Sequence, residues 1–344
     1  MNKLIRKAGG LFREIILFKE IILILVLIVV GITMSIVSPY FFTRLNIEAI
    51  FVGLSVEGII VIGMAILLIS GGFDLSVGST LAFTGVVTGL SLAAGIPVIF
   101  SILLGLLAAV SIGIINGMLI AKLNLNPLIT TLGMMMAVRG FTLILSKGRA
   151  VLNLPESFKV IGRGTLFGVQ YPVYLLIGLV IVGDILLRNI RFFRQSYYVG
   201  GNELAAKMNG INVVRVKIFN YCLVAMLAGL AGILITARFG SASVTVGQGM
   251  ELKIIAAAII GGSSLKGGVG TVLGAFLGAL FMQIISTSLN ILGVDIYYQY
   301  AVTGIILIIA ILADELRERK RVGGGLSSLL KEKSNNSNNI RIKL

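Results

Sequence analysis

The stretch GGFDLSVGS, residues 71–79, holds the polar side chains that are best placed for chemistry. Its paired glycines end one apolar run, Asp74 follows, and a second apolar run begins at once. A carboxylate is stabilised at a helix N-terminus, and Ser76 and Ser79 are near enough to cap the next helix. Asp74 therefore either only caps that helix or belongs to a hinge or pathway element. Non-helical backbone at membrane depth must line protein or water, which favours the second interpretation if the runs cross a membrane.

Several kinds of chemistry are excluded by residues that the sequence lacks. It has no histidine, which removes Ser-His-Asp catalysis and histidine metal sites. The lone Cys222 can form neither an intrachain disulfide nor a cysteine cluster. No G-x-x-x-x-G-K-[ST] loop occurs. We therefore expect no catalytic residue, no metal site and no ATP site in this chain.

The composition indicates a chain that lies in lipid. It is 57% hydrophobic and only 12% charged, with a mean hydropathy of +1.04, whereas a soluble domain carries about a quarter charged residues. A spanning helix needs about 20 mostly apolar residues, which predicts an all-α polytopic membrane protein with about ten transmembrane helices. The predicted spans are 20–37, 50–70, 75–93, 97–120, 127–145, 172–188, 216–236, 251–263, 268–290 and 297–313.

The distribution of basic residues predicts the orientation. With an inward N-terminus, 21 of the 29 lysines and arginines fall in cytoplasmic segments and seven in outer segments, as the positive-inside rule requires. Both termini are then cytoplasmic. The expected organisation is a cytoplasmic segment 1–19, a transmembrane domain 20–313 containing a basic cytoplasmic loop 189–215, and a charged, disordered cytoplasmic tail 314–344.

Two breaks interrupt the spans, near 70–76 and 261–268. Each combines paired glycines with a following apolar run, in ISGGFDLSVGSTLAF and in IIGGSSLKGGVGTVLGAF. Transporters often place broken helices at their site. The span count gives the two breaks the same orientation, and one miscounted span would make them inverted. The hinge or pathway candidates are Gly71, Gly72, Asp74, Ser76, Gly261 and Gly262.

Polar residues inside the spans form a second group. Glu57 and Arg139 lie well inside their spans, and we expect them to pair because a lone charge at the bilayer centre is costly. Asp184 is expected to pair with Arg188, one turn later. Three amides either hydrogen-bond a solute or join helices: Asn116, Gln283 and Asn290. Glycines four residues apart, as in Gly113 and Gly117, predict close helix contacts.

The basic loop contains GGNELAAKMNGI, residues 200–211. Asn202 can cap a short helix with Glu203 in its first turn, and Gly210 can end it. Ala205 and Ala206 give that helix a small apolar face. The segment is either a plain surface connector or a docking element for a cytoplasmic partner.

Four stretches together resemble the permease subunits of the ribose/galactose/xylose/autoinducer-2 class of bacterial ABC importers. They are NGMLIAKLNLNPLITTLGMM at 116–135, AAAIIGGSSLKGGVGTVLGAFLGAL at 256–280, and the two motifs GGFDLSVGS and GGNELAAKMNGI. They cover most of residues 50–313 in family order, so the combination is specific although each stretch alone is weak.

The resemblance implies a permease that carries a monosaccharide or related small polar solute across the bacterial inner membrane. It implies two cytoplasmic ATPases, a second permease copy or paralogue, and an extracytoplasmic solute-binding protein. ATP and Mg would be bound by the ATPase only, with no cofactor in this chain. The coupling residues would be Asn202, Glu203, Ala205, Ala206 and Gly210.

Three other functions are open alternatives. An ion-coupled secondary transporter needs ionisable groups near mid-membrane, for which Glu57 and Asp74 are the sparse candidates. An intramembrane enzyme needs clustered nucleophiles or acids, whereas the carboxylates here are scattered among the spans. A membrane scaffold without transport would copurify with neither an ATPase nor a binding protein.

The docking assignment makes one prediction. Replacing Ala206 or Gly210 with a bulky residue is expected to abolish uptake while the protein still inserts in the membrane. Solute uptake into cells, measured at matched protein levels, checks this. Normal uptake by such variants would show that the segment does not dock.

Overall fold

The computed structural model describes the backbone of residues 2–316 and side-chain positions from residue 20 to 316. Its elements are α1 (Asn2–Val37), α2 (Arg44–Ile69), α3 (Val77–Ala93), α4 (Val98–Ala121), α5 (Pro127–Ser146), α6 (Glu156–Arg163), β1 (Thr165–Leu166), β2 (Val169–Gln170), α7 (Tyr171–Asn189), α8 (Arg191–Gly201), α9 (Glu203–Met208), α10 (Val213–Phe239), α11 (Met250–Ile260) and α12 (Val272–Ile291). A last helix covers Ile296–Leu316. The part of the predicted tail beyond residue 316 lies outside the described residues.

The structure confirms the all-α polytopic fold. Each of the ten predicted spans coincides with a helix, and eight of these helices in the described chain are long and apolar enough to cross a membrane. The other two, α3 and α11, are shorter. Helix ends follow local signals: Asn126 caps α5 through its side chain, and Gly240 ends α10 in the left-handed conformation.

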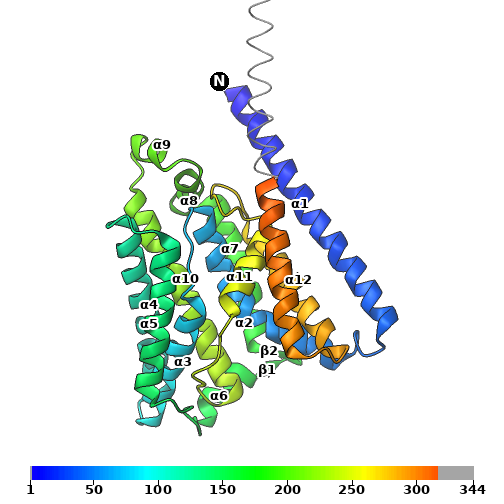
Figure 1. The fold of residues 1–344 in the computed structure, drawn as a ribbon, viewed down its shortest axis with the longest axis vertical. Helices are drawn as coiled ribbons and strands as arrows, with labels where there is room; N and C mark the ends of the chain where they lie inside the picture. Colours follow the sequence, from blue (N-terminus) through cyan, green and yellow to red (C-terminus); the bar gives the residue numbers. More distant parts are fainter. Residues whose placement is uncertain (1, 317–344) are drawn as a thin grey trace, which may run out of the picture.

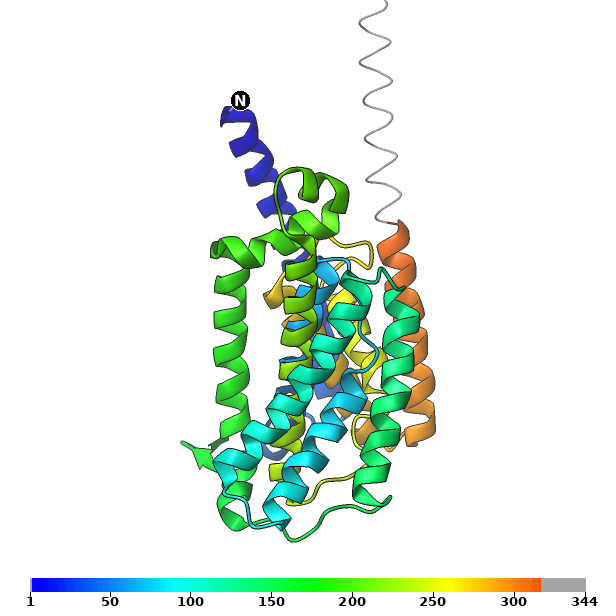
Figure 2. The ribbon, with the colours of Figure 1, turned by 90° about the vertical axis from the view of Figure 1, so that its left-hand side faces the viewer.

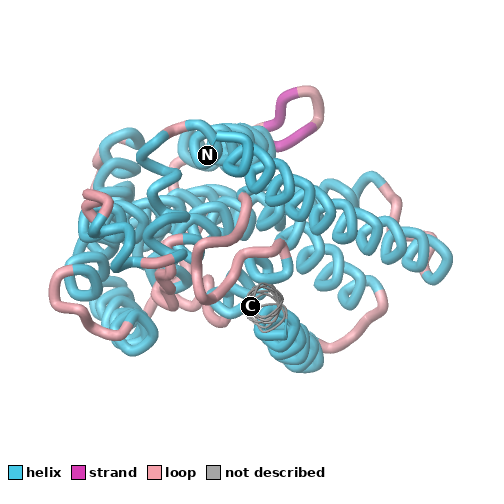
Figure 3. The backbone as a smooth tube through the Cα atoms, turned by 90° about the horizontal axis from the view of Figure 1, so that it is seen from above, coloured by secondary structure: helices cyan, strands magenta, loops and turns pink. Residues whose placement is uncertain are grey.

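The helices run side by side between two ends of the bundle (Figure 1). The N-terminus, α8 and α9 lie at one end, which the basic residues assign to the cytoplasm, and α6 with the β1–β2 hairpin lies at the other, outer end. Seen from above, the hairpin projects from the edge of the bundle (Figure 3). β1 and β2 pair antiparallel, with Thr165 opposite Gln170.

α2 and α10 form the centre of the bundle. α10 packs against α2, α3 and α4, and α2 also packs against α7, α11 and α12. In its most apolar stretch α2 is 89% buried, whereas the last helix is only 6% buried. α1 also leans away from the bundle toward the outer end (Figure 1). The outer helices therefore present apolar faces to lipid or to another protein.

Glycines permit the close packing around α10. A Cβ on Gly232 would overlap the carbonyl oxygen of Leu81 in α3, and one on Gly113 would lie 2.6 Å from the carbonyl oxygen of Tyr221. Gly117 similarly faces the Cα of Ile218 at 2.8 Å. Backbone therefore meets backbone between α10 and its neighbours, which confirms the close contacts predicted from glycine spacing.

Both predicted breaks are present and lie at the cytoplasmic end. The first separates α2 from α3 and the second separates α11 from α12. The amide of Gly268 in the second break donates to the carbonyl oxygen of Ile69 at the end of α2, at 2.8 Å. α3 and α12 both run outward from these breaks (Figure 1). The two breaks therefore have the same orientation, as the span count predicted.

One segment differs from its prediction. Residues 241–249, named the strap from here on, were expected in an outer loop but run inward along α3 before α11 begins. At the outer end, Ala242 pairs with Val151. At the inner end, Gly247 lies against Gly78 near the start of α3. α11 is short because the strap has already covered part of the depth of the bundle.

The packing at Gly232 generates a stability prediction. Gly232→Ala places a methyl group into backbone of α3, and such overpacking costs about 1–3 kcal/mol. The thermal unfolding midpoint of the purified chain in detergent is expected to fall. Gly133→Ala in α5 is the matched control, because nothing lies within 4 Å of its Cβ position. An equal effect of both substitutions would contradict the packing described here.

Candidate functional site

Asp74 is the centre of a buried hydrogen-bonded turn between α2 and α3, which we name the hinge after its predicted role. Its side chain is 1% exposed, and Oδ1 accepts hydrogen bonds from the Ser76 amide at 2.7 Å and the Ser76 hydroxyl at 2.6 Å. Asn116 Nδ2, from α4, donates to Ser76 Oγ at 3.0 Å and more weakly to Asp74 Oδ2 at 3.4 Å. The carboxylate thus fixes the turn that starts α3.

The capping roles of the serines differ from their prediction. Ser76 is the N-cap residue of α3, but its side chain makes no capping bond. Its hydroxyl donates to Asp74 instead, and Ser79 Oγ donates to the Ser76 carbonyl oxygen at 2.8 Å. The Ser76 hydroxyl binds Asp74 because a carboxylate is the stronger acceptor, and the Ser79 hydroxyl is used within the first turn of the helix.

Tyr221 of α10 holds the same turn from the other side. Its hydroxyl accepts from the Phe73 amide at 3.2 Å and donates to the Phe73 carbonyl oxygen at 3.1 Å. The ring is fully buried. One tyrosine, which the sequence analysis missed, therefore satisfies both polar groups of Phe73 in this non-helical turn.

Three glycine-containing segments meet at the cytoplasmic end, and we name this contact the glycine junction. A Cβ on Gly200 of α8 would overlap the Ile69 carbonyl oxygen and lie 2.7 Å from the Gly268 amide. A Cβ on Gly267 would lie 3.0 Å from the Gly71 amide. Tyr197 of α8 also donates to the Gly270 carbonyl oxygen at 2.8 Å. The junction connects α8 directly to both breaks.

Tyr197 keeps its donor role over the physiological range. It lies in α8, outside the spans, and burial raises the pKa of its hydroxyl to about 12. The hydroxyl therefore stays protonated, and the bond from Tyr197 to the second break persists.

The predicted short helix is α9, Glu203–Met208, at the cytoplasmic end (Figure 1). Asn202 Oδ1 accepts from the Ala205 amide at 2.9 Å, and Gly210 follows the helix with a positive φ of 78°. Glu203 Oε2 lies 2.6 Å from Lys217 Nζ at the start of α10. The hydrogen bond from Lys217 is the main cause that lowers the pKa of the Glu203 carboxyl, so the ion pair persists at neutral pH.

The apolar face of α9 differs from the predicted one. Ala206 is buried in a cluster with Val199, Val213 and Val216, so it attaches α9 to α8 and α10 and is not displayed for docking. Leu204 and Met208, which the sequence reasoning missed, are 69% and 82% exposed. They are four residues apart and so share one face of the helix, a spacing that was readable in the sequence.

The charged residues inside the bundle pair differently from the prediction. Glu57 does not pair with Arg139; its Oε1 lies 2.7 Å from Lys253 Nζ, and both side chains are largely buried. Arg139 instead donates to the carbonyl oxygens of Val244 and Val246 in the strap. The prediction missed this pair because it counted Lys253, at the outer end of the predicted span 251–263, among the outer basic residues, whereas the strap brings it inside the bundle. The predicted pair of Asp184 and Arg188 is present, at 2.6 Å.

The other pathway candidates lie apart from one another. Gln283 Nε2 contacts Thr287 at 3.4 Å and its amide group faces Gly53 of α2. Asn290 accepts from Gln299 of the last helix at 2.8 Å. Gly261 caps α11 against the backbone of Gly274. Each of these side chains or backbones joins two helices in this conformation.

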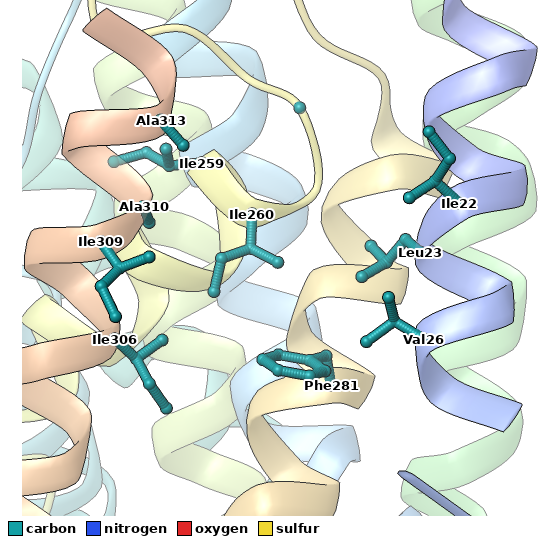
Figure 4. A pocket seen from close by; sticks show the side chains of 11 residues that line it. Ile22, Leu23, Val26, Ile259, Ile260, Phe281, Ile306, Ile309, Ala310 and Ala313 are labelled. Carbon is teal, nitrogen blue, oxygen red and sulfur yellow. The ribbon is translucent and has the colours of Figure 1, made fainter. Parts of the chain in front are cut away.

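An apolar cavity near these residues does not suit a polar solute. It has a volume of about 390 Å³ and lies between α1, α11, α12 and the last helix (Figure 4). Its lining side chains are aliphatic or aromatic, and Gly262 contributes backbone only. They are Ile22, Leu23, Val26, Ile259, Ile260, Phe281, Ile306, Ile309, Ala310 and Ala313.

A helical bundle with eight long apolar helices, satisfied internal breaks and a short cytoplasmic helix is the architecture of a polytopic membrane permease. The chain belongs to the family described as the permease component of the branched-chain amino acid transport system, which matches residues 46–311. It is a multi-pass membrane protein of the bacterial inner membrane, and it is a transport component and not an enzyme.

Characterised relatives are similar along most of the chain. A ribose import permease of Bacillus subtilis is 37% identical over 290 residues, 84% of this chain and 90% of the relative. An L-arabinose ABC transporter permease of Azospirillum brasilense is 36% identical over 317 residues, 92% of each chain. An L-arabinose transport system permease of Escherichia coli is 36% identical over 299 residues, 87% of this chain and 91% of the relative. No solved structure matches the chain.

The hinge generates a comparison of two carboxylates. Asp74→Asn keeps an oxygen that can accept from Ser76, but it removes the charge and places an NH₂ donor where Oδ2 accepts from Asn116, which costs about 1–3 kcal/mol of hinge stability. Asp184→Asn removes a partly exposed ion pair worth at most about 1 kcal/mol. Uptake at matched expression is expected to fall much more for Asp74→Asn. Equal uptake by the two variants would show that the hinge matters no more for transport than the Asp184 ion pair.

Proposed function

We propose that this chain is the membrane-spanning subunit of an ABC importer that carries a monosaccharide or related small polar solute into the cell. The ribose and arabinose permeases to which it is similar support this solute class. The single observation that carries the coupling part is α9, a capped helix at the cytoplasmic end with Leu204 and Met208 displayed. An exposed apolar pair on a short, well-anchored helix suits insertion into a groove on a partner.

A continuous set of contacts leads from α9 to the hinge. Ala206 packs against Val199 of α8, so movement of α9 displaces α8. Gly200, in the last turn of α8, contacts the backbone at the end of α2 and the second break. The first break continues into the turn held by Asp74 and Tyr221. ATP-driven movement of a partner would therefore reach both breaks through packed backbone.

The proposal also assigns a role to each partner subunit. Separate cytoplasmic ATPase subunits bind ATP and Mg, and an extracytoplasmic binding protein delivers the solute. A second permease copy or paralogue completes the membrane unit, which accords with the apolar faces left open on the last helix and α1. This chain needs no cofactor of its own.

Secondary transport is the competing mechanism. It requires ionisable groups free to exchange a coupling ion near mid-membrane. Here Glu57 is paired with Lys253, and Asp74 is enclosed by Ser76 and Asn116. Uptake that persists without the ATPase and is abolished by an ionophore would favour secondary transport over the ATP-driven mechanism.

The exposed pair on α9 tests the coupling role. Leu204→Ala combined with Met208→Ala removes the displayed apolar groups and should weaken ATPase binding about ten-fold or more, as loss of two interface anchors does. Copurification of the ATPase with the tagged permease measures this, and uptake should fall in parallel.

Phe167→Ala is the matched control for that experiment. Phe167 is 94% exposed but lies in the hairpin at the outer end, so its loss removes apolar surface without touching the cytoplasmic side. It should leave ATPase copurification unchanged. Full copurification with the double α9 variant would place the docking site elsewhere.

A further inference from the structure

The strap is non-helical backbone deep within the bundle. Its outer part, Ala242, lies against Gly89 of α3, and its inner part, Gly247, lies against Gly78. These two glycines of α3 are separated by about 16 Å at about 1.5 Å per residue. Arg139, which holds the middle of the strap, lies about 10 Å from the outer end of α5. Figure 2 shows the strap in the interval between α5 and the rest of the bundle.

The protein satisfies only part of the backbone of the strap. Arg139 Nη1 donates to the carbonyl oxygens of Val244 at 2.7 Å and of Val246 at 3.1 Å. Within residues 2–316, no acceptor is present for the amides of Ser243, Val244, Val246 and Gly247. Unpaired amides in hydrocarbon cost several kcal/mol each. Val244 and Gly247 are buried, whereas Ser243 and Val246 are partly exposed, so water or a polar solute can reach the strap at these two residues.

The side chains of the strap have the same polar character. Ser243 Oγ and Thr245 Oγ1 form a hydrogen bond with each other at 3.1 Å, and Thr245 is exposed. Gln248 is also exposed, and its side-chain carboxamide makes no hydrogen bond in the described part of the chain. Hydroxyl and amide groups that both donate and accept match the hydroxyls of a polyol.

A second cavity, with a mixed polar and apolar lining, adjoins the inner end of the strap. Gly249 lies against the ring of Tyr300 in the last helix, with 3.5 Å between the Gly249 Cβ position and Tyr300 Cε1. The cavity has a volume of about 160 Å³. Its lining combines five polar residues, Lys253, Ser286, Gln299, Tyr300 and Thr303, with four apolar residues, Met282, Ile285, Leu289 and Ile296. An aromatic face beside hydroxyl and amide groups suits a solute with both apolar C–H and polar O–H surfaces.

The charges around this region balance. Lys253 is paired with Glu57 at 2.7 Å, and Arg139 lies near enough to Glu251 for a mutual electrostatic effect. Glu251 also lies beside Gly78, 2.7 Å from the Cβ position of that residue. Two cationic and two anionic side chains leave no net charge, so the region favours neither an anion nor a cation.

We infer that the strap and the adjoining Tyr300 cavity form a water-lined wall of the solute pathway, built for a neutral polyhydroxy solute. Ser243, Thr245 and Gln248 supply exchanging hydrogen bonds, and Arg139 is the positioning residue that holds the strap open toward the pathway. The inference rests on the proposed transport function and specifies where in the chain the solute passes.

Cysteine labelling tests the location. In a Cys222→Ser background, single variants Thr245→Cys and Gln248→Cys are compared with Leu107→Cys in right-side-out vesicles that contain the whole transport complex. Leu107 is 62% exposed on α4 and lies about 14 Å from the outer end of that helix, a depth similar to that of the strap. The probe is a charged, membrane-impermeant methanethiosulfonate, which reacts with thiolate in water.

The strap positions are expected to react about ten-fold or more faster than Leu107→Cys, because thiolate forms only where water reaches the side chain. Labelling of Gln248→Cys should also block uptake of a pentose. Strap positions that react no faster than Leu107→Cys overturn the inference. ATP-dependent uptake by the unlabelled Cys222→Ser parent is measured separately, so loss of the transport function and loss of the pathway assignment are distinguishable.

Two variants of Arg139 test its positioning role. Arg139→Gln loses the cation that bridges two carbonyl oxygens, whereas Arg139→Lys keeps a charged donor. Uptake should fall strongly for the first and less for the second, and the labelling rate of Gln248→Cys should change only in the first. Parent-like uptake and labelling in both variants would overturn the positioning role.

Discussion

Every feature of this molecule depends on one constraint: inside lipid, each backbone polar group needs a partner. Most of the chain meets it with helices, which satisfy their own backbone. The interruptions require named side chains. Tyr221 serves the Phe73 peptide, Asp74 serves the amide of Ser76, and Arg139 serves two carbonyls of the strap. The positions of these side chains therefore mark the non-helical segments of the chain and their depth in the bundle.

Much of the fold was readable because long apolar runs and glycine pairs act locally. All ten spans and both breaks follow from hydropathy and from glycine positions such as Gly71 and Gly261. The short helix α9 follows from Asn202 and Gly210, whose effects extend over a single turn. Interactions that close within one or two turns need no knowledge of the tertiary structure.

The parts that were mistaken depend on contacts distant in sequence. The strap has the composition of an outer loop, and only its packing on α3 brings it inside. That displacement explains why Lys253, not Arg139, is the partner of Glu57. Ala206 was assigned to an exposed face because a six-residue helix gives no clear amphipathic pattern, and its burial depends on Val199 and Val216 from neighbouring helices.

The glycine junction has a consequence for how such a permease can diversify. In the proposed coupling path, Gly200, Gly267 and Gly71 meet through main chain, so this contact carries almost no side-chain information. Selectivity for cargo, in contrast, would depend on side chains elsewhere in the bundle. Under this proposal, coupling to the ATPase and selectivity for the solute can evolve separately, and one type of ATPase can power permeases that transport different solutes.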